Sequence, residues 1–385
     1  MVSLSNHERW RRALQLPVAM HPLDDPGLYS LVDPADMLGR LRELPRQCRE
    51  AWRRAQPFAL SLDRRPVARV LVLGMGGSAI AGDMLAALVA GESPVPVLVL
   101  RGYDLPPGLN EDNLIIASSY SGETEETLSA FQQALATGAG KLAVTSGGRL
   151  EAVARERSVP VFRIEHPGPP RAALGYSLMP LLAVARRFGL LSLDDADVEE
   201  AAAVMGWPQA RAGRVEKAGL LREIDAATPA AENPAKALAE RLLGRLPVVY
   251  GAGFLSPVAR RWKTQLNENS KVWSSWEELP EADHNAVVGY RLPEEVRRQA
   301  FVVLLHSSHL HPRTLLRYEA TRELLQEAEV EHETIEAHGR GPLAQMLSLA
   351  LYGDYVSYYL ALLQGVDPTP VPAIEALKKQ LAQGT

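Results

Sequence analysis

Cysteine is almost absent from this chain. Cys48 is the only cysteine among 385 residues, so the sequence excludes an internal disulfide. Disulfides persist in oxidising compartments and are rare where thiols are kept reduced, so we expect a cytoplasmic protein. The first dozen residues, which include Glu8, Arg9 and Arg11, are not followed by an apolar stretch, and we therefore expect no secretory signal.

Long apolar runs and dense basic blocks are missing as well. Apolar runs are broken by Gly, Asp or Arg before they reach the about 18 residues that a membrane span needs, so we expect no membrane partner. The net charge is −5 and the Lys and Arg residues form no stripe, which argues against nucleic acid as a partner. A small anionic ligand is compatible with this charge, because one local site can attract it.

The length of the chain fits two domains of ordinary size. Short β-rich runs alternate with longer helical patterns, which predicts an α/β fold with parallel sheets flanked by helices. The predicted strands are Val70–Leu73, Val97–Leu100, Leu114–Ala117, Leu142–Val144, Val161–Ile164, Pro247–Tyr250 and Phe301–Leu305. Because the second half repeats the order of the first, we predict two tandem, nucleotide-fold-like subdomains. They span residues 46–191 and 232–385, with a helical connector at 192–231 and a helical extension at 1–45.

Glycine residues directly follow the first predicted strand. Gly76, Gly77 and Ser78 lie between that strand and a predicted helix, where the backbone can approach an anion and the free N–H groups of the helix face it. Gly74, Gly76 and Ala79 also satisfy the loose G-x-G-x-x-A fingerprint of dinucleotide sites, so an NAD(P)-dependent dehydrogenase is an alternative. A third interpretation is that the glycines only permit close packing of helix and strand.

Three hydroxyl side chains crowd the turn after the third predicted strand. Ser119, Ser121 and Thr124 lie where this strand meets the next helix. Hydroxyls together with backbone N–H groups make a cradle for a terminal phosphate. Capping of the helix would need one hydroxyl rather than three. The turn therefore favours a phosphorylated small molecule over a dinucleotide.

The two loops together resemble those of a known family. Gly-Met-Gly-Gly-Ser at 74–78 and Ser-Tyr-Ser-Gly-Glu-Thr at 119–124 resemble the sugar isomerase (SIS) domain. Three further stretches resemble the bifunctional phosphoglucose/phosphomannose isomerases: Leu-Asn-Glu-Asn-Ser-Lys at 266–271, Asp-His-Asn at 283–285 and Asp-Pro-Thr-Pro at 367–370. The resemblance extends from near residue 30 to the C-terminus. One departure is Glu123, where many members carry a neutral residue.

The resemblance implies two SIS-type subdomains and an aldose–ketose isomerase. Such an enzyme would interconvert glucose 6-phosphate, and mannose 6-phosphate as well, with fructose 6-phosphate through an enediolate. The reaction needs a carboxylate base, a group that opens the sugar ring and a positive charge beside the developing oxyanion. The resemblance also implies a phosphorylated hexose as the substrate, a homodimer, and catalysis without a cofactor or metal.

The resemblance assigns a residue to each of these three roles. Glu268 would be the base, and the apolar stripe of its predicted helix, which includes Trp262 and Leu266, leaves it off the core face. His284 would open the ring, in its own or in the partner subunit's site. Arg171, which follows two prolines, would stabilise the enediolate. Each of the three could instead be an ordinary solvated side chain.

A C-terminal lysine beside the sugar ring is also implied by the resemblance. The candidates are Lys378 and Lys379. Ile374, Leu377 and Leu381 form an apolar stripe at helical spacing. Lys378 falls beside this stripe and Lys379 points well away from it, so we choose Lys378. An amphipathic tail with two solvated lysines is the alternative.

A non-catalytic sugar-phosphate-binding regulator with the same fold is the main alternative function. It would need neither Glu268 nor His284, and it would usually carry a DNA-binding or partner domain, for which residues 1–45 are too short and too weakly basic. His306, His309 and His311 lack an acidic or cysteine companion at ligand spacing, so the sequence predicts no metal site.

Overall fold

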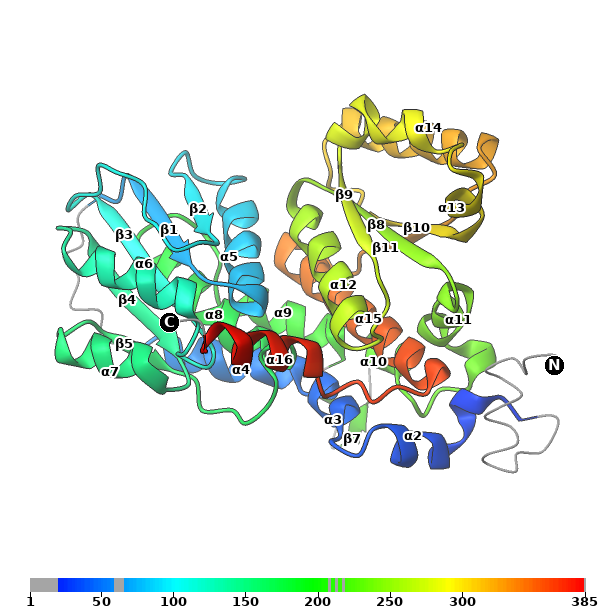
Figure 1. Cartoon of the computed structure of the whole chain (residues 1–385), viewed down its shortest axis with the longest axis horizontal. Coiled ribbons are helices and arrows are strands. Elements are labelled where there is room, and N and C mark those ends of the chain that lie inside the picture. Colours follow the sequence, from blue (N-terminus) through cyan, green and yellow to red (C-terminus); the bar gives the residue numbers. More distant parts are fainter. Residues whose placement is uncertain (1–19, 59–65, 207–208, 212–213, 217–218, 384–385) are drawn as a thin grey trace.

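The computed structural model describes residues 20–58, 66–206, 209–211, 214–216 and 219–383. Figure 1 shows two α/β halves side by side, each built around its own parallel sheet. This arrangement confirms the predicted fold class. Residues 1–19 of the predicted N-terminal extension, Glu8, Arg9 and Arg11 among them, lie outside the described residues.

The first sheet has five parallel strands in the order β2-β1-β3-β4-β5. The elements of this half are η1 (Pro22–Asp24), α2 (Pro26–Val32), α3 (Met37–Arg42), α4 (Leu44–Ala55), β1 (Arg69–Leu73), α5 (Gly76–Val89), β2 (Val97–Leu100), β3 (Asn113–Ser118), α6 (Glu125–Leu135), β4 (Gly140–Thr145), α7 (Gly148–Glu156), β5 (Val161–Arg163), η2 (Pro170–Ala172) and α8 (Leu174–Arg187). Val70 and Val72 share a core with α5 and α8, whereas Leu71 and Leu73 share one with α6 and α7. Helices therefore cover both faces, as a parallel sheet requires.

The second sheet repeats this topology with four parallel strands in the order β9-β8-β10-β11. The elements of this half are β8 (Leu246–Ala252), η4 (Gly253–Leu255), α12 (Ser256–Glu268), β9 (Ser275–Leu279), η5 (Glu281–His284), η6 (Ala286–Gly289), α13 (Glu294–Gln299), β10 (Ala300–His306), α14 (Pro312–Glu327), β11 (Glu331–Glu336), α15 (Pro342–Gln364) and α16 (Pro372–Leu381). In both sheets the strand that comes first in sequence lies between the second and the third. Sequence analysis missed β9 and β11 because both are edge strands rich in glutamate, which lack the apolar pattern of a buried strand.

The segment between the sheets combines helices with a small hairpin. Its elements are α9 (Asp195–Met205), β6 (Gln209–Arg211), β7 (Arg214–Glu216), α10 (Leu221–Ile224), η3 (Ala230–Glu232) and α11 (Pro234–Leu242). Strands β6 and β7 pair antiparallel, and no strand was expected in the predicted helical connector at 192–231. The domain boundaries stay a prediction, and helix α4 runs across the first of them, at residue 46.

Helix α15 is the longest described helix and forms the centre of the second half. Its 23 residues are long enough and on average apolar enough to cross a membrane, yet every residue of its most apolar window is buried inside the protein. It contacts α9, α11 and α12, which is typical of a core helix. Sequence analysis missed this helix because Gly353 and Asp354 interrupt its apolar run.

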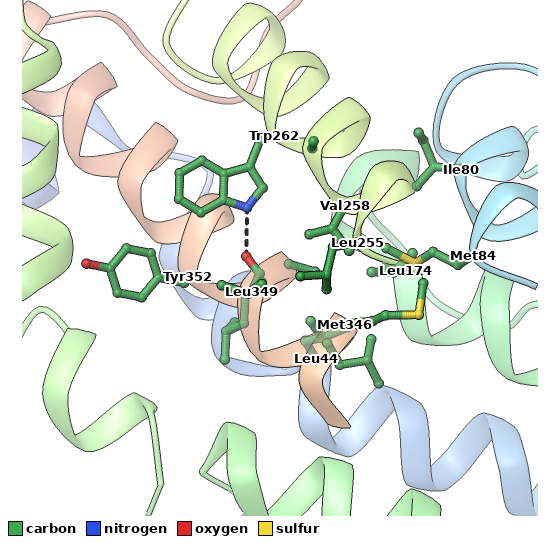
Figure 2. Packing of buried hydrophobic residues seen from close by; sticks show 14 of the residues in the cluster. Leu44, Ile80, Met84, Leu174, Leu255, Val258, Trp262, Met346, Leu349 and Tyr352 are labelled. Atoms are coloured by element: carbon green, nitrogen blue, oxygen red, sulfur yellow. Dashed lines mark hydrogen bonds between the residues drawn. The ribbon is translucent and has the colours of Figure 1, made fainter. Parts of the chain in front are cut away.

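The close approach of α12 and α15 depends on one tryptophan. Trp262 of α12 donates a hydrogen bond of 2.8 Å to the carbonyl of Leu349, and its ring stacks on Tyr352 with centroids 6.0 Å apart (Figure 2). Gly353 lies under the same ring, since a Cβ there would be 2.4 Å from two indole atoms. A glycine is therefore required where the two helices touch.

Substituting Gly353→Ala should destabilise the protein. The added methyl group would overlap a ring that is fixed by its hydrogen bond, and overpacking of this kind costs about 1–3 kcal/mol. The better helix propensity of alanine offsets at most about 1 kcal/mol of that cost. Urea unfolding measures the change. The control is Gly102→Ala, where a Cβ would meet nothing within 4 Å, and an equal stability of the two variants would contradict this account of the helix contact.

Candidate active site

The two loops singled out in the sequence meet at one edge of the first sheet. Strands β1 and β3 are neighbours, and the chain leaves β1 toward β2 on one side and β3 toward β4 on the other. In open parallel sheets, ligands bind at the carboxyl ends of two strands that part in this way. The loop at Gly74–Ser78 follows β1 and the loop at Ser119–Thr124 follows β3, so both lie at this position.

Glycine is favoured at two positions of the first loop, for a different structural reason at each. Gly74 lets the two loops touch, because a Cβ there would be 2.9 Å from the carbonyl oxygen of Ser118. Gly76 has φ +51°, a left-handed conformation that disfavours side chains, although a Cβ there would meet nothing within 4 Å. Helix α5 begins at Gly76 without a side-chain cap. The N–H groups of its first turn are therefore available to an anion.

The hydroxyls of the second loop bind one another and the loop backbone. The hydroxyl oxygens of Ser119 and Thr124 are 2.9 Å apart, and the hydroxyl of Ser121 accepts a hydrogen bond from the amide of Glu123 at 3.2 Å. Ser78 joins the two loops, because its hydroxyl accepts from the amide of Tyr120 at 3.3 Å. Thr124 precedes α6 but does not cap it. Helix capping therefore does not explain why three hydroxyl residues occur in this loop.

Arg171 connects the loops of the first half to the second half. It lies in η2, beside the glycine loop, since a Cβ on Gly77 would be 3.8 Å from its Cα. Its guanidinium is 4% exposed and donates to the side-chain oxygen of Asn269 at 2.7 Å. It also lies 3.4 Å from the carboxylate of Glu268. Burial lowers the pKa of Arg171, and the carboxylate of Glu268 opposes that shift.

The same guanidinium also binds the chain that follows α15. It donates to the carbonyls of Pro368 and Thr369 at 2.6 and 2.7 Å. The hydroxyl oxygen of Thr369 is buried without a hydrogen-bond partner in the described part of the chain. Three stretches of the predicted pattern, at Arg171, at Glu268 and at 367–370, are therefore brought together.

Helix α12 presents a buried polar face beneath these contacts. Arg261 donates to the carbonyl of Arg171 at 3.0 Å and to the carboxylate of Asp354 at 2.6 Å, and Gln265 donates to the other oxygen of the same carboxylate at 2.8 Å. Burial raises the pKa of Asp354, and Arg261 opposes that shift. Sequence analysis missed this network. The signal was present, because residues 261, 265 and 268 have the i, i+4, i+7 spacing of one helix face.

Comparison with known proteins agrees with this arrangement. Residues 231–381 match the family model of the bacterial phospho-glucose isomerase C-terminal SIS domain. A protein from Caldicellulosiruptor bescii, named bifunctional phosphoglucose/phosphomannose isomerase, is 37% identical over 90% of this chain and 99% of its own length. A protein of the same name from Aquifex aeolicus is 33% identical over 84% of this chain and 93% of its own length. This chain belongs to the bifunctional phosphoglucose/phosphomannose isomerase family. The resemblance inferred from the motifs is confirmed.

A solved structure supports the fold of this family member. The C-terminal domain of glucosamine-fructose-6-phosphate aminotransferase from Francisella tularensis superposes with a TM-score of 0.63, covering 87% of this chain and 98% of that domain. At 14% identity the likeness concerns the fold alone. The dinucleotide interpretation of the glycine loop loses its support, because relatives that match most of the chain are named isomerases.

The charge of Glu123, where the sequence analysis expected a departure from the family pattern, is paired locally. Its carboxylate accepts hydrogen bonds of 2.7 Å from the side chain and from the backbone amide of Arg149, at the start of α7. These bonds lower the pKa of Glu123. The acid is thus bound to an arginine next to the hydroxyl loop of this family member.

His284 does not join Arg171 and Glu268 within one protomer. Helix α12 starts at the carboxyl edge of the second sheet and runs back, so Glu268 at its end lies toward the amino edge. His284 follows β9 and lies beyond the carboxyl end of that strand, at the opposite edge. Asp283 anchors its loop by accepting hydrogen bonds from Arg317 and Thr321. The histidine itself is exposed.

Lys378 lies on α16, none of whose residues is buried. The apolar stripe beside it is open to solvent in the protomer, since Ile374, Leu377 and Leu381 are each more than 40% exposed. No hydrogen bond or ion pair joins Lys378 to Arg171 or Glu268 in the described ranges of the chain. Its assignment stays a prediction.

Substituting Gly76→Ala should weaken phosphate binding. Alanine at positive φ costs about 1 kcal/mol of stability, and its methyl group would project at the start of α5. Gly189→Ala is the matched control, because Gly189 has φ +70° and equally open space around its Cβ position but lies outside both loops. Urea unfolding should show similar losses for both. Calorimetric titration with inorganic phosphate should show weaker binding for Gly76→Ala alone, and equal binding by both variants would argue against this loop as the phosphate site.

Proposed function

We propose that this protein interconverts glucose 6-phosphate and mannose 6-phosphate with fructose 6-phosphate. The observation that carries the proposal is the meeting of Arg171 and Glu268, 3.4 Å apart, beside two loops suited to phosphate. A carboxylate and a fixed positive charge are what proton transfer through an enediolate needs. The names of the relatives support the same substrates.

The proposed mechanism divides the substrate between the two halves. The first half binds the phosphate through Gly76, Gly77, Ser78, Ser119, Ser121 and Thr124. Glu268 removes the proton from C2 of the aldose and returns it to C1, while the proton of the C2 hydroxyl passes to the oxygen on C1, so that the enediolate forms and collapses to the ketose without net loss of a proton. Arg171 stabilises the negative charge that develops on the oxygens. Because this arginine supplies the positive charge, the proposal includes no metal and no cofactor.

We further propose that two copies form a dimer in which His284 and Lys378 reach the partner subunit's site. His284 is exposed at the edge opposite its own Glu268, next to Asp283, which Arg317 and Thr321 anchor. Exposed apolar side chains flank it, with Val288 and Leu292 more than 75% exposed. A second exposed apolar set consists of Trp273, five residues after Glu268, and the stripe of α16. A two-fold axis would bury each set against the other and bring His284 of each chain to the other's Glu268.

The cytoplasm is the proposed location. Cys48 is buried and unpaired, which suits a reducing compartment. Neither nucleic acid nor a membrane is part of the proposal.

Substituting Glu268→Gln should lower kcat by about 10²–10⁴-fold, because the amide cannot accept the substrate proton. A coupled assay that follows fructose 6-phosphate formation measures the loss, and phosphate binding should persist. The control is Glu199→Gln, which breaks a surface ion pair with Arg49 and removes the same charge far from the site. If Glu268→Gln turns over at the wild-type rate, Glu268 is not the base.

Mixing two inactive variants tests the shared site. A dimer of one Glu268→Gln chain and one His284→Ala chain has one doubly defective site and one intact site if His284 crosses between subunits. Random re-pairing should then restore about one quarter of the wild-type activity. If His284 serves its own chain, every site in the mixture is defective and activity stays at the level of the single variants.

A further inference from the structure

Lys271 ends the Leu-Asn-Glu-Asn-Ser-Lys stretch that carries the resemblance, and it is a cation beside Glu268 that has no role in the mechanism above. Its ammonium donates hydrogen bonds to the carbonyls of Glu268, Asn269 and Asp367 at 2.8, 3.2 and 2.8 Å. The first two carbonyls end α12, where a helix has no internal partners for them. The third belongs to the segment after α15. The three N–H donors of the ammonium therefore link the C-terminal end of α12 to a separate stretch of chain.

The backbone of Lys271 is unusual for a lysine. It has φ +58°, the left-handed conformation that helix ends normally assign to glycine. A side chain in this conformation costs about 1 kcal/mol or more. A strained residue of this kind at a site points to a role for its side chain. Glycine would adopt this backbone conformation without strain. The feature that lysine adds at this position is therefore its ammonium group.

Lys271 and Arg171 bind three consecutive backbone carbonyl groups. Lys271 binds the carbonyl of Asp367, and Arg171 binds those of Pro368 and Thr369. The side chain of Asp367 accepts from the amide of Thr369 at 2.8 Å, which closes the turn. The position of Arg171 relative to Glu268 is thus set through one short segment that two cations hold.

The electrostatics of this cluster make the lysine titratable near neutral pH. Partial burial and, secondarily, the charge of Arg171 lower the pKa of Lys271 to about 8, while Asp367 and Glu268 oppose the shift. Below this pH the ammonium has three donors for three carbonyls. Above it the neutral amine keeps two donors, so one of these hydrogen bonds is lost.

We propose that Lys271 is a positioning residue, which fixes Glu268 against the segment that holds Arg171. This inference rests on the proposed isomerase function, because it assigns Lys271 a role in keeping the base and the cation of that reaction in register. The lysine acts through these two residues rather than on the substrate. Misplacement of a reacting group by about 1 Å can lower a rate by about 10²-fold, which sets the size of effect to expect.

Three substitutions separate the effect of the Lys271 ammonium from the effect of its strained backbone conformation. Lys271→Gly removes the ammonium and the strain, Lys271→Met removes the ammonium and keeps the strain, and Lys271→Arg keeps a cation. Kinetics with fructose 6-phosphate should show kcat lowered about 10–100-fold in the first two variants, with KM changed less than about threefold because the phosphate loops lie in the other half. The arginine variant should recover part of the loss. Urea unfolding should show Lys271→Gly to be more stable than Lys271→Met, since only glycine relieves the strain.

The pH profile adds a measurement that a merely structural lysine would not change. Wild-type kcat should fall as the pH rises through about 8, and this decline should move to higher pH in Lys271→Arg, because arginine keeps its proton. The proposal is overturned if both Lys271→Gly and Lys271→Met keep kcat within about twofold of wild type, or if their loss lies in KM. If the wild-type protein itself forms no fructose 6-phosphate, the proposed function fails instead, and the two failures are distinct.

Discussion

The candidate site depends on one buried guanidinium. Arg171 leaves the first half and finds its hydrogen-bond acceptors in the second, at Asn269, Pro368 and Thr369. An arginine that is 4% exposed would be costly without such partners, because charge taken out of water must be compensated by hydrogen bonds and opposite charge. The partners that compensate Arg171 are also the groups that place it beside Glu268. Stability and geometry of the site therefore share the same contacts.

Helix α12 contacts both halves of the molecule and thereby helps to fix the position of Arg171. Its apolar face holds Trp262 against α15, and its polar face holds Arg261 against Asp354 and the carbonyl of Arg171. It also faces α5, the helix that begins at the glycine loop (Figure 1). A single helix thus connects the core of the second half, Glu268 at its own end and the helix that begins at the glycine loop of the first half.

The duplicated topology produces two equivalent sheet edges, and only one of them is suited to an anion. Gly253 after β8 has φ +51°, the same value as Gly76 after β1. In the second half, however, Leu310 approaches Gly253, with a side-chain carbon 3.4 Å from its Cβ position, and the hydroxyl of Ser307 is bound to Gln345. In the first half the corresponding space is open. Within one protomer, the second sheet therefore contributes the end of α12 rather than its strand ends to the candidate site.

The sequence by itself determined the alternation of strands and helices, the two loops at the switch point and the family, because these depend on local periodicity and on short contiguous motifs. It missed β9, β11 and α15, whose residues take their character from their position at a sheet edge or in the core. It assigned Arg171 and Glu268 to one site only through the resemblance, and it gave Lys271, Arg261 and Asp354 no role. Only the tertiary structure determines the roles of these charged side chains, because each of them binds carbonyl groups or buried partners that lie far away in the chain. The same packing separated His284 from Glu268, because a helix that runs antiparallel to its strands ends at the opposite edge of the sheet.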